Sequence, residues 1–349
     1  MPSIIREITQ LLHMAISSKA SDLHISVGSP PVMRIDGSLH KLEGGPVTPE
    51  EAGLMASALM GSERSTAFEG QGEIDFSYPL DNGVRFRVNV YRQRGGISIA
   101  ARAIPAEIPS MEQLSLPPIL SVLSKKPQGL ILVTGPTGSG KSSTLAAMIQ
   151  YINQTESKHI ITLEDPIEFL HSHGTCLVDQ REVGSDTASF ANGLRAALRQ
   201  DPDVILVGEM RDLETISAAV TAAETGHLVM ATLHTSDAPQ TIDRIVDTFP
   251  GHQQGQIRSQ LASVLLAVVS QRLFPRAGGR GRLCATEILV NTPAVANLIR
   301  TDKTHQIKNV MQTSRSLGMH TLEMSIRESL SHGLIQPEAA KAYMTEVTP

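Results

Sequence analysis

The stretch "GPTGSGKS", Gly135 to Ser142, constrains the fold of this chain more than any other. It fits the pattern G-x-x-x-x-G-K-[ST], follows the apolar run "GLILVT" and precedes a segment of helical character. Glycines let backbone amides approach phosphate oxygens, and the positive end of the following helix attracts the same charge. An ordinary Gly-rich turn is the alternative interpretation, but the flanking strand and helix favour a phosphate-binding loop.

This loop predicts ATP and Mg²⁺ as cofactors. Lys141 is expected to reach the β and γ phosphates, and Ser142 to ligate the metal ion. The expected nucleotide-binding residues are Gly135, Pro136, Thr137, Gly138, Ser139, Gly140, Lys141, Ser142 and Ser143.

Composition limits the other possibilities. The 349 residues suffice for about two domains of the usual ~150 residues. A net charge of -5 gives no overall attraction for nucleic acid or anionic lipid. Cys176 and Cys284 form no CxxC pair, so zinc and redox motifs are not expected and a cytoplasmic location is the simplest one. The apolar run "LASVLLAVV" is about half a membrane span, so any membrane association is expected through a partner, without insertion.

Residues 1–104 predict a smaller α+β domain with an antiparallel sheet. Alternating segments predict hairpins with turns at 36–37 and 81–83, and the opening segment predicts an amphipathic helix. A further helix is expected after Thr48, with Glu51 in the capping-box position.

Residues 105–120 contain four prolines and predict a linker, after which residues 121–349 change character. Strands alternate with helices there, which predicts an α/β domain with a parallel sheet and crossover helices. From Asp237 onward we expect mostly helix, with one apolar helical stripe formed by Ile257, Leu261, Val264, Leu265 and Val268.

Polar residues follow three of the apolar runs. Glu164 follows "HIITL", Glu209 follows "VILVG", and His234 follows "HLVMATL". In an open parallel sheet, ligands bind outside the carboxyl ends of the strands, so these side chains are expected to meet beside the phosphate loop. Capping or solvation explains any one of them more easily than all three.

The segment "VILVGE" departs from a common pattern, because such strands usually end in Asp-Glu and Gly208 replaces the aspartate. Glu164 and Glu209 can still divide the work of orienting water and holding the metal shell. Mg²⁺ would then rely on Ser142, phosphate oxygens and water. Helix capping by Glu209 is the alternative, but Asp212 is better placed for that role.

His227 and His234 lie at opposite ends of one expected strand, roughly 23 Å apart at ~3.3 Å per residue. Only His234 can lie near the phosphate loop, where a neutral imidazole could sense the γ-phosphate. His227 is more typical of a packing histidine, unless another subunit or domain reaches that end of the strand.

Arginines from outside the loop can neutralise charge in phosphoryl transfer, although most strand arginines are only solvated. Arg195 and Arg199 are expected on one helical face at i and i+4. The first domain holds Arg85, Arg87, Arg92, Arg94 and Arg102.

Taken together, these segments resemble the type IV pilus retraction ATPases, the PilT family of the secretion ATPase superfamily. The resemblance covers essentially the whole chain and includes the Gly-Glu ending as that family's own Walker B motif. It rests on "SDLHIS", "RFRVN", "GPTGSGKSS", "TLEDPIEF", "LRQDPDVILVGEMRD", "TGHLVMATLHT", "DRIVDTFP", "SQRL" and "GMHTLE".

The resemblance implies a PAS-like domain, then a RecA-like ATPase domain, in a homohexameric cytoplasmic ring. Such a ring couples ATP hydrolysis to pilin removal at the inner membrane, against a platform protein. Other pilus motor ATPases are candidate partners. The residues that match the family's catalytic set are Glu164, Glu209, His227, His234, Arg87, Arg102, Arg195 and Arg199.

One segment departs from the family. The signature Ala-Ile-Arg-Asn-Leu-Ile-Arg-Glu appears here as "AVANLIRT", without an arginine at Ala296 and a glutamate at Thr301. Because Val295, Leu298 and Ile299 have the spacing of a buried stripe, we expect both changes on an exposed face. An accessory retraction motor is therefore an alternative to the main one.

Three further alternatives are weaker. A pilus assembly or type II secretion ATPase resembles a longer chain, often with a four-cysteine zinc insertion. A nucleic-acid translocase needs a basic channel and stacking aromatics, whereas aromatic residues make up 3% of this chain and tryptophan is absent. The presence of Lys141, Glu164 and Glu209 argues against a non-catalytic nucleotide sensor.

Overall fold

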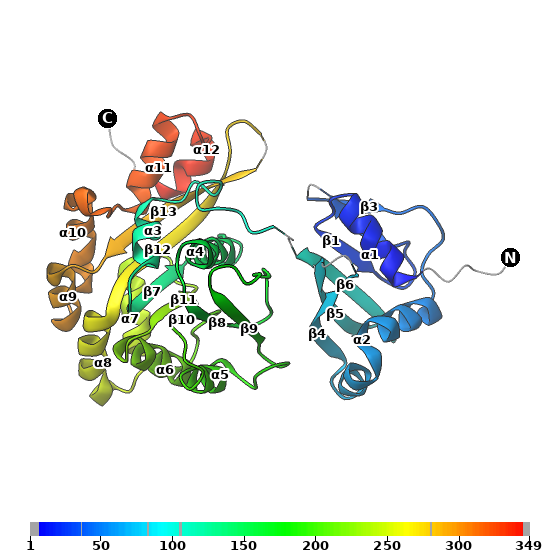
Figure 1. The fold of residues 1–349 in the computed structure, drawn as a ribbon. Coiled ribbons are helices and arrows are strands. Elements are labelled where there is room, and N and C mark those ends of the chain that lie inside the picture. Colours follow the sequence, from blue (N-terminus) through cyan, green and yellow to red (C-terminus); the bar gives the residue numbers. More distant parts are fainter. Residues whose placement is uncertain (1–6, 36, 82–83, 105–106, 280, 345–349) are drawn as a thin grey trace. The chain divides into compact units, whose positions relative to one another are not determined.

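A computed structural model describes the chain except for residues 1–6, 36, 82–83, 105–106, 280 and 345–349. The chain divides into two compact units, Met1–Glu107 and Ile108–Pro349 (Figure 1). This division falls inside the predicted linker, and Met111 and Leu116 from that segment pack in the core of the second unit. The predicted turns at 36–37 and 81–83 lie partly outside the described residues.

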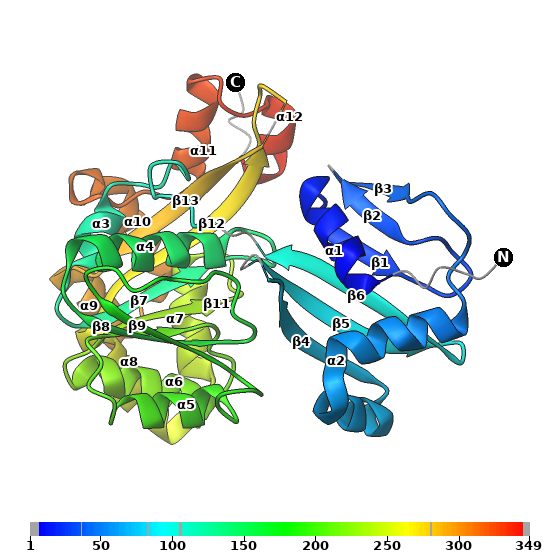
Figure 2. The same ribbon diagram turned by 45° about the vertical axis from the view of Figure 1, so that its right-hand side comes forward.

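The first unit is an antiparallel sheet packed against two helices (Figure 2). The described strands follow the order β3-β2-β1-β6-β5-β4. Along β5, buried and partly exposed residues alternate, so that Phe86, Val88 and Val90 share the buried face. The elements are α1 (Ile8–Ser17), β1 (Asp22–Ile25), β2 (Val32–Ile35), β3 (Ser38–Lys41), α2 (Pro49–Gln71), β4 (Glu73–Pro79), β5 (Arg85–Gln93) and β6 (Gly96–Ile104).

The capping box at the start of α2 is confirmed. Thr48 Oγ1 accepts a hydrogen bond from the Glu51 amide at 3.2 Å, and the Glu51 carboxylate accepts one from the Thr48 amide at 2.9 Å. These bonds satisfy amides that no helical carbonyl can reach.

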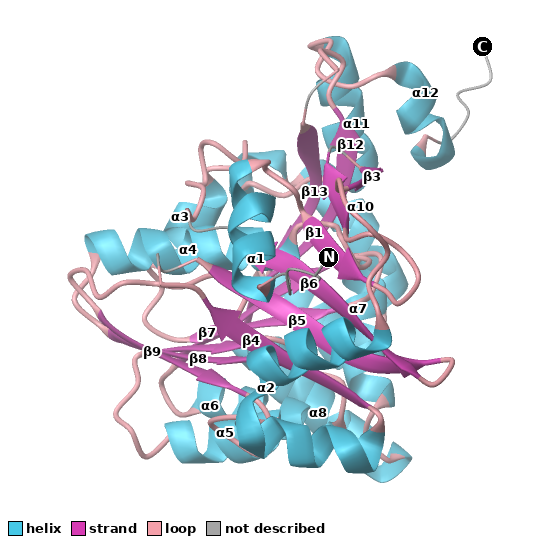
Figure 3. Cartoon of the chain, turned by 90° about the vertical axis from the view of Figure 1, so that its right-hand side faces the viewer, coloured by secondary structure: helices cyan, strands magenta, loops and turns pink. Residues whose placement is uncertain are grey.

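The second unit is built on a mixed sheet, whose described strands follow the order β13-β12-β7-β11-β10-β8-β9 (Figure 3). Neighbouring strands are parallel except for the antiparallel pair of β12 and β13. The strands are β7 (Gly129–Thr134), β8 (His159–Glu164), β9 (Leu177–Glu182), β10 (Val204–Val207), β11 (Leu228–Leu233), β12 (Leu265–Pro275) and β13 (Arg282–Val290).

Helices cover both faces of this sheet. Leu130 and Leu132 of β7 pack with the helices from α5 to α10, whereas Ile131 and Val133 pack with α3 and α4. Burial on both faces explains why β7 is a continuous apolar run. The helices are α3 (Ile119–Ser124), α4 (Lys141–Thr155), α5 (Phe190–Ala197), α6 (Leu213–Glu224), α7 (Ala238–Asp247), α8 (Gly251–Val264), α9 (Pro293–Arg300), α10 (Ile307–Thr313), α11 (Leu322–Ser331) and α12 (Pro337–Ala340).

The prediction of mostly helix after Asp237 is wrong in one region. β12 and β13 form a long hairpin there, and β12 pairs with the central strand β7. The predicted helical stripe therefore breaks after Val264, because Leu265 and Val268 belong to β12. A short apolar run satisfies both helical and strand periods, and here pairing with β7 decides between them.

The expectation of an exposed face at "AVANLIRT" holds for Thr301 and is wrong for Ala296. Thr301 is exposed after the end of α9, but Ala296 is 7% exposed and packs in the same core as Val295 and Ile299. The buried stripe of α9 is thus wider than the three apolar residues alone indicate.

No helix in the described part of the chain is long and apolar enough to cross a membrane.

Candidate active site

The phosphate loop connects β7 to α4, and its shape requires glycine at two positions. Gly135 has φ +142° and Gly140 φ +89°, values that side chains disfavour. A Cβ at Gly135 would lie 2.5 Å from the Gln271 carbonyl oxygen and 2.6 Å from Ser139 Oγ. The glycines therefore let the loop close tightly against β12.

The donors of this loop suit a phosphate group. The first turn of α4 has no side-chain cap, so its amides are available to an anion. Ser139 is 3% exposed, and its buried Oγ has no hydrogen-bond partner in the described structure. Thr137 and Gly138 are exposed at the tip of the loop.

Lys141, the first residue of α4, points back along the loop. Its Nζ donates to the carbonyl oxygens of Gly135 at 2.9 Å and Pro136 at 3.1 Å. Burial lowers the pKa of Lys141, while the charges of Glu209 and Glu168 raise it. The ammonium group is thus held where a phosphate bound in the loop would replace its weaker neutral partners.

His234 connects Lys141 to Glu209. Its Nδ1 lies 3.5 Å from Lys141 Nζ, and its Nε2 lies 3.0 Å from Glu209 Oε1. Because an ammonium group only donates, Nδ1 accepts, and the imidazole proton on Nε2 points to the carboxylate. The guanidinium of Arg211 contacts the same carboxylate oxygen through Nε at 2.6 Å.

Glu164 ends β8, which is paired with β10 in the sheet. Its Oε1 accepts hydrogen bonds from Thr162 Oγ1 at 2.7 Å and Gln180 Nε2 at 3.0 Å. Burial raises the pKa of Glu164, and the two hydrogen bonds partly oppose that effect. This carboxyl group therefore binds a proton more readily than an exposed glutamate does.

The backbone around Gly208 explains why glycine replaces the usual aspartate. A Cβ at this position would lie 3.1 Å from the Leu163 carbonyl oxygen and 3.3 Å from Glu164 Cα. β8 and β10 approach too closely here for a larger residue without displacement. Asp212 caps α6 by accepting from the Thr215 amide at 2.9 Å, as predicted, so capping does not require Glu209.

The predicted site residues separate into those that meet at the loop and those that do not. His227 precedes β11 at the opposite end from His234, and its Nδ1 contacts the Ala222 carbonyl oxygen at 2.9 Å. Arg195 of α5 pairs with Glu214 at 2.7 Å. Arg199 lies beyond the end of α5, in a turn. The two arginines were predicted to share one helical face, but only Arg195 belongs to the helix.

Three arginines of the first unit, Arg34, Arg87 and Arg102, lie in one row across its sheet. The register places Arg34 opposite Asp22, Asp22 opposite Arg102, and Arg102 opposite Arg87. Arg102 Nε donates to Asp22 at 2.8 Å, and Arg87 bonds to Asp75 through two nitrogens. Although burial raises the pKa of Asp22, hydrogen bonds from Ser21 and Arg102 hold it below the usual value.

Three residues that shape the site were not predicted from the sequence. Gln271 of β12 is 2% exposed, donates to the Ser139 carbonyl at 2.7 Å and accepts from Thr144 Oγ1 at 3.1 Å, which ties the loop to α4. In the sequence, Gln271 could have been recognised as a polar residue two positions after the apolar run "LLAVV". Gln180 and Arg211 gave no such signal, because their strand and loop carry many polar residues.

A model of the type II/IV secretion system protein family matches residues 1–278. The chain belongs to this family. Its resemblance to the pilus retraction ATPases is also confirmed. The chain is 48% identical over 335 residues to a "Type IV pilus retractation ATPase PilT" of Pseudomonas aeruginosa, with 96% of this chain and 97% of that protein covered.

Two other members of the family inform the comparison. The "Type IV pilus ATPase PilU" of Pseudomonas aeruginosa is 40% identical over 337 residues, covering 97% of this chain and 88% of that protein. A crystal structure of "the Pilus Retraction Motor PilT and Bound ADP" aligns with a TM-score of 0.92 and 48% identity over 98% of both chains. The α/β fold with its mixed sheet is thus that of a known nucleotide-binding motor.

Proposed function

We propose that this protein is a motor ATPase that couples ATP hydrolysis to type IV pilus retraction. The observation that carries the proposal is the contact series from Lys141 through His234 to Glu209, which joins the phosphate loop to the Walker B carboxylate. The 48% identity to a named retraction ATPase supplies the process that the hydrolysis drives.

The chemistry follows from the residues at the carboxyl ends of the strands. Loop amides and Lys141 hold the β and γ phosphates, and Glu209 and Glu164 orient the attacking water between them. His234 bridges the lysine and the carboxylate, so it can register the presence of a γ-phosphate. When bound, Mg²⁺ would neutralise phosphate charge. Ser142, which follows Lys141 in the loop, is its protein ligand in this proposal.

The arginines complete the proposed catalytic set. Arg87 and Arg102 in the first unit, with Arg195 and Arg199 in the second, would stabilise negative charge in the transition state. In this proposal the second unit is a RecA-like ATPase domain and the first a PAS-like domain. His227 is included because, in a ring, its end of β11 would face a neighbouring subunit or domain.

The working assembly is proposed to be a cytoplasmic homohexamer, peripheral at the inner membrane, where a platform protein receives the motion. An accessory retraction motor is the second candidate. It is favoured by the missing glutamate at the exposed Thr301.

Glu209→Gln tests the proposal, because it removes the carboxylate charge and keeps the size of the side chain. We expect kcat for phosphate release to fall by at least ~100-fold while ATP binding persists. Glu224→Gln, at the exposed end of α6, is the matched control and should keep normal turnover. Near-normal turnover in Glu209→Gln would overturn the site assignment.

The cellular role needs a second measurement. We expect this chain, expressed in a strain without retraction ATPases, to restore pilus shortening, and Glu209→Gln not to restore it. Restored pilus extension without shortening would instead identify an assembly ATPase.

A further inference from the structure

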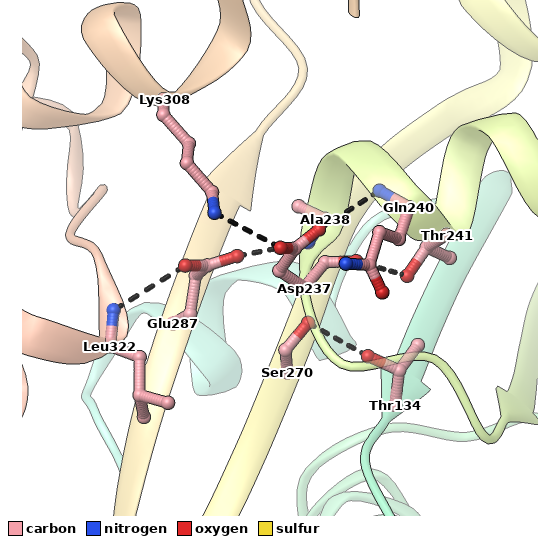
Figure 4. A network of polar contacts seen from close by, with 9 residues as sticks. All are labelled: Thr134, Asp237, Ala238, Gln240, Thr241, Ser270, Glu287, Lys308 and Leu322. Carbon is pink, nitrogen blue, oxygen red and sulfur yellow. Dashed lines mark hydrogen bonds and ion pairs between the residues drawn. The ribbon is translucent and has the colours of Figure 1, made fainter. Parts of the chain in front are cut away.

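Glu287 is a buried carboxylate to which the proposed hydrolysis assigns no role (Figure 4). It lies on β13, is 3% exposed, and accepts two backbone hydrogen bonds. Oε1 accepts from the Ala238 amide at 2.9 Å, and Oε2 accepts from the Leu322 amide at 3.4 Å. Ala238 and Leu322 are the first residues of α7 and α11, so one carboxylate satisfies the amides of two helices.

A third helix joins this cluster through a shared lysine. Asp237, the N-cap of α7, accepts from the Gln240 amide at 2.9 Å and pairs with Lys308 of α10 at 3.0 Å. Burial raises the pKa of Glu287, the helix amides and Lys308 lower it, and Asp237 raises it. Figure 4 shows Lys308 reaching Asp237 beside Glu287, so α7, α10 and α11 meet at one point on β13.

The same point fixes the segment that carries His234. This segment leaves β11 after Leu233 and enters α7 at Ala238, where Glu287 holds the amide. Between these ends, Thr235 Oγ1 contacts Thr241 Oγ1 at 2.7 Å. Glu287 therefore holds the start of α7 four residues after His234 in the chain.

On its other side, Glu287 holds the segment "GMHTLE", for which the proposed hydrolysis has no use. His320 Nε2 contacts Thr286 Oγ1 at 2.9 Å, and His320 exchanges backbone hydrogen bonds with Ile288. The residues on both sides of Glu287 thus dock this segment onto β13. A displacement of α10 or α11 would reach the His234 segment through this strand.

The two helix amides give this buried carboxylate a structural role, and the same contacts place it where it can position the segment that carries His234. Burying a charged group is costly even when it is paired, and apolar replacements of buried ionic groups are often neutral or stabilising. A group that accepts from two helices at once is suited instead to holding them in a fixed relation.

We propose that Glu287 is a positioning residue, which keeps His234 in contact with Glu209 and couples that contact to α10 and α11. This inference rests on the proposed role of His234 in hydrolysis. It assigns the Glu287 cluster as the connection between the nucleotide site and the C-terminal helices.

Glu287→Gln tests the proposal, because its amide group offers one acceptor and one donor, so one helix amide loses its partner. We expect kcat for ATP hydrolysis to fall about tenfold and KM to change less than about twofold, since the loop itself is untouched. Glu328→Gln on α11, where the carboxylate is 55% exposed, is the matched control and should match the unchanged protein.

His234→Ala in both backgrounds separates positioning from general destabilisation. If Glu287 acts through His234, Glu287→Gln should have no further effect once His234 is alanine. An equal loss with and without His234, or no loss in either background, would overturn the inference while the proposed function stands. If His234→Ala alone leaves turnover unchanged, the role of His234 in the proposed function fails, and this inference fails with it.

Lys308→Met provides a second route if Glu287→Gln does not fold. Lys308 is half exposed and contacts Asp237, so its loss leaves two neighbouring carboxylates without their cation. We expect a smaller fall in kcat that also disappears in the His234→Ala background. A fall of equal size in both backgrounds would count against the inference.

Discussion

Glu164 shows how burial sets the chemical state of a side chain in this site. Burial raises its pKa, and hydrogen bonds from Thr162 and Gln180 counter this effect. The net effect is a raised pKa, so this carboxyl group takes up a proton at higher pH than an exposed glutamate does.

This balance predicts a pH dependence. If hydrolysis uses ionised Glu164, kcat falls as pH falls through the pKa of that group, which lies above the usual value of ~4.3. Thr162→Val removes one hydrogen bond that lowers this pKa, so the acid limb of the kcat profile should move to higher pH. Thr221→Val, on the exposed side of α6, is the control. An unmoved limb in Thr162→Val would show that Glu164 does not govern it.

Among the secondary-structure elements, β8 and β10 form the part of the site that departs from the usual Asp-Glu pattern of nucleotide hydrolases. The two strands run parallel with Leu163 opposite Val207, and Gly208 follows where a Cβ would meet backbone atoms of β8. The glycine is therefore a consequence of strand spacing. An aspartate there would need the two strands to move apart.

Gly208→Asp tests that explanation. We expect the free energy of unfolding to fall by about 1–3 kcal/mol, the usual effect of overpacking, and turnover to fall with it. Gly255→Asp is the control, because a Cβ at Gly255 of α8 meets no atom within 4 Å. The measurement is the denaturant midpoint of each variant. Unchanged stability with increased turnover would show that the site can accept a normal Asp-Glu pair.

Sequence patterns predicted the parallel strands that end at the site, but they did not predict the β12–β13 hairpin that packs beside them. β7, β8, β10 and β11 are buried runs between clear turn signals, and the carboxyl-end rule then placed Lys141, Glu209 and His234 together. β12 and β13 were missed, because an Ala, Leu and Val run fits a helix equally well until its partner strand is known.

The supporting contacts were beyond sequence analysis for a different reason. Gln271 reaches Ser139 from 132 positions away, and Glu287 joins helices that begin 49 positions before it and 35 positions after it. Contacts of this range depend on the sheet order, which no local period contains. Ala296 was misplaced because alanine fits both buried and exposed helix positions.

For the entire protein, the division into two units separates the groups proposed to act together. Arg87 and Arg102 belong to Met1–Glu107, whereas Lys141 and Glu209 belong to Ile108–Pro349. If these arginines act in hydrolysis, a first unit and a second unit must come together at the nucleotide. The two units can belong to one chain or to neighbouring chains. Nucleotide turnover and movement of units would then be linked, as a motor requires.

The "AVANLIRT" segment predicts how this linkage differs from that of the family. Ala296 is buried in α9, so Ala296→Arg should lower the free energy of unfolding by about 1–3 kcal/mol. Thr301 is exposed, so Thr301→Glu should cost at most about 1 kcal/mol, from its charge at a helix C-terminus. The two missing family residues therefore have separable effects.

Thr301→Glu is the informative change for function. ATP turnover should stay unchanged because Thr301 is exposed at the end of α9 and the helix keeps its buried stripe, while pilus retraction by this chain alone should become more frequent. Retraction frequency and force, recorded in a strain whose only retraction ATPase is this chain, are the measurements. Thr313→Glu, just as exposed at the end of α10, controls for added charge. Full retraction by the unchanged protein, with no gain from Thr301→Glu, would show that this surface does not limit coupling to the pilus.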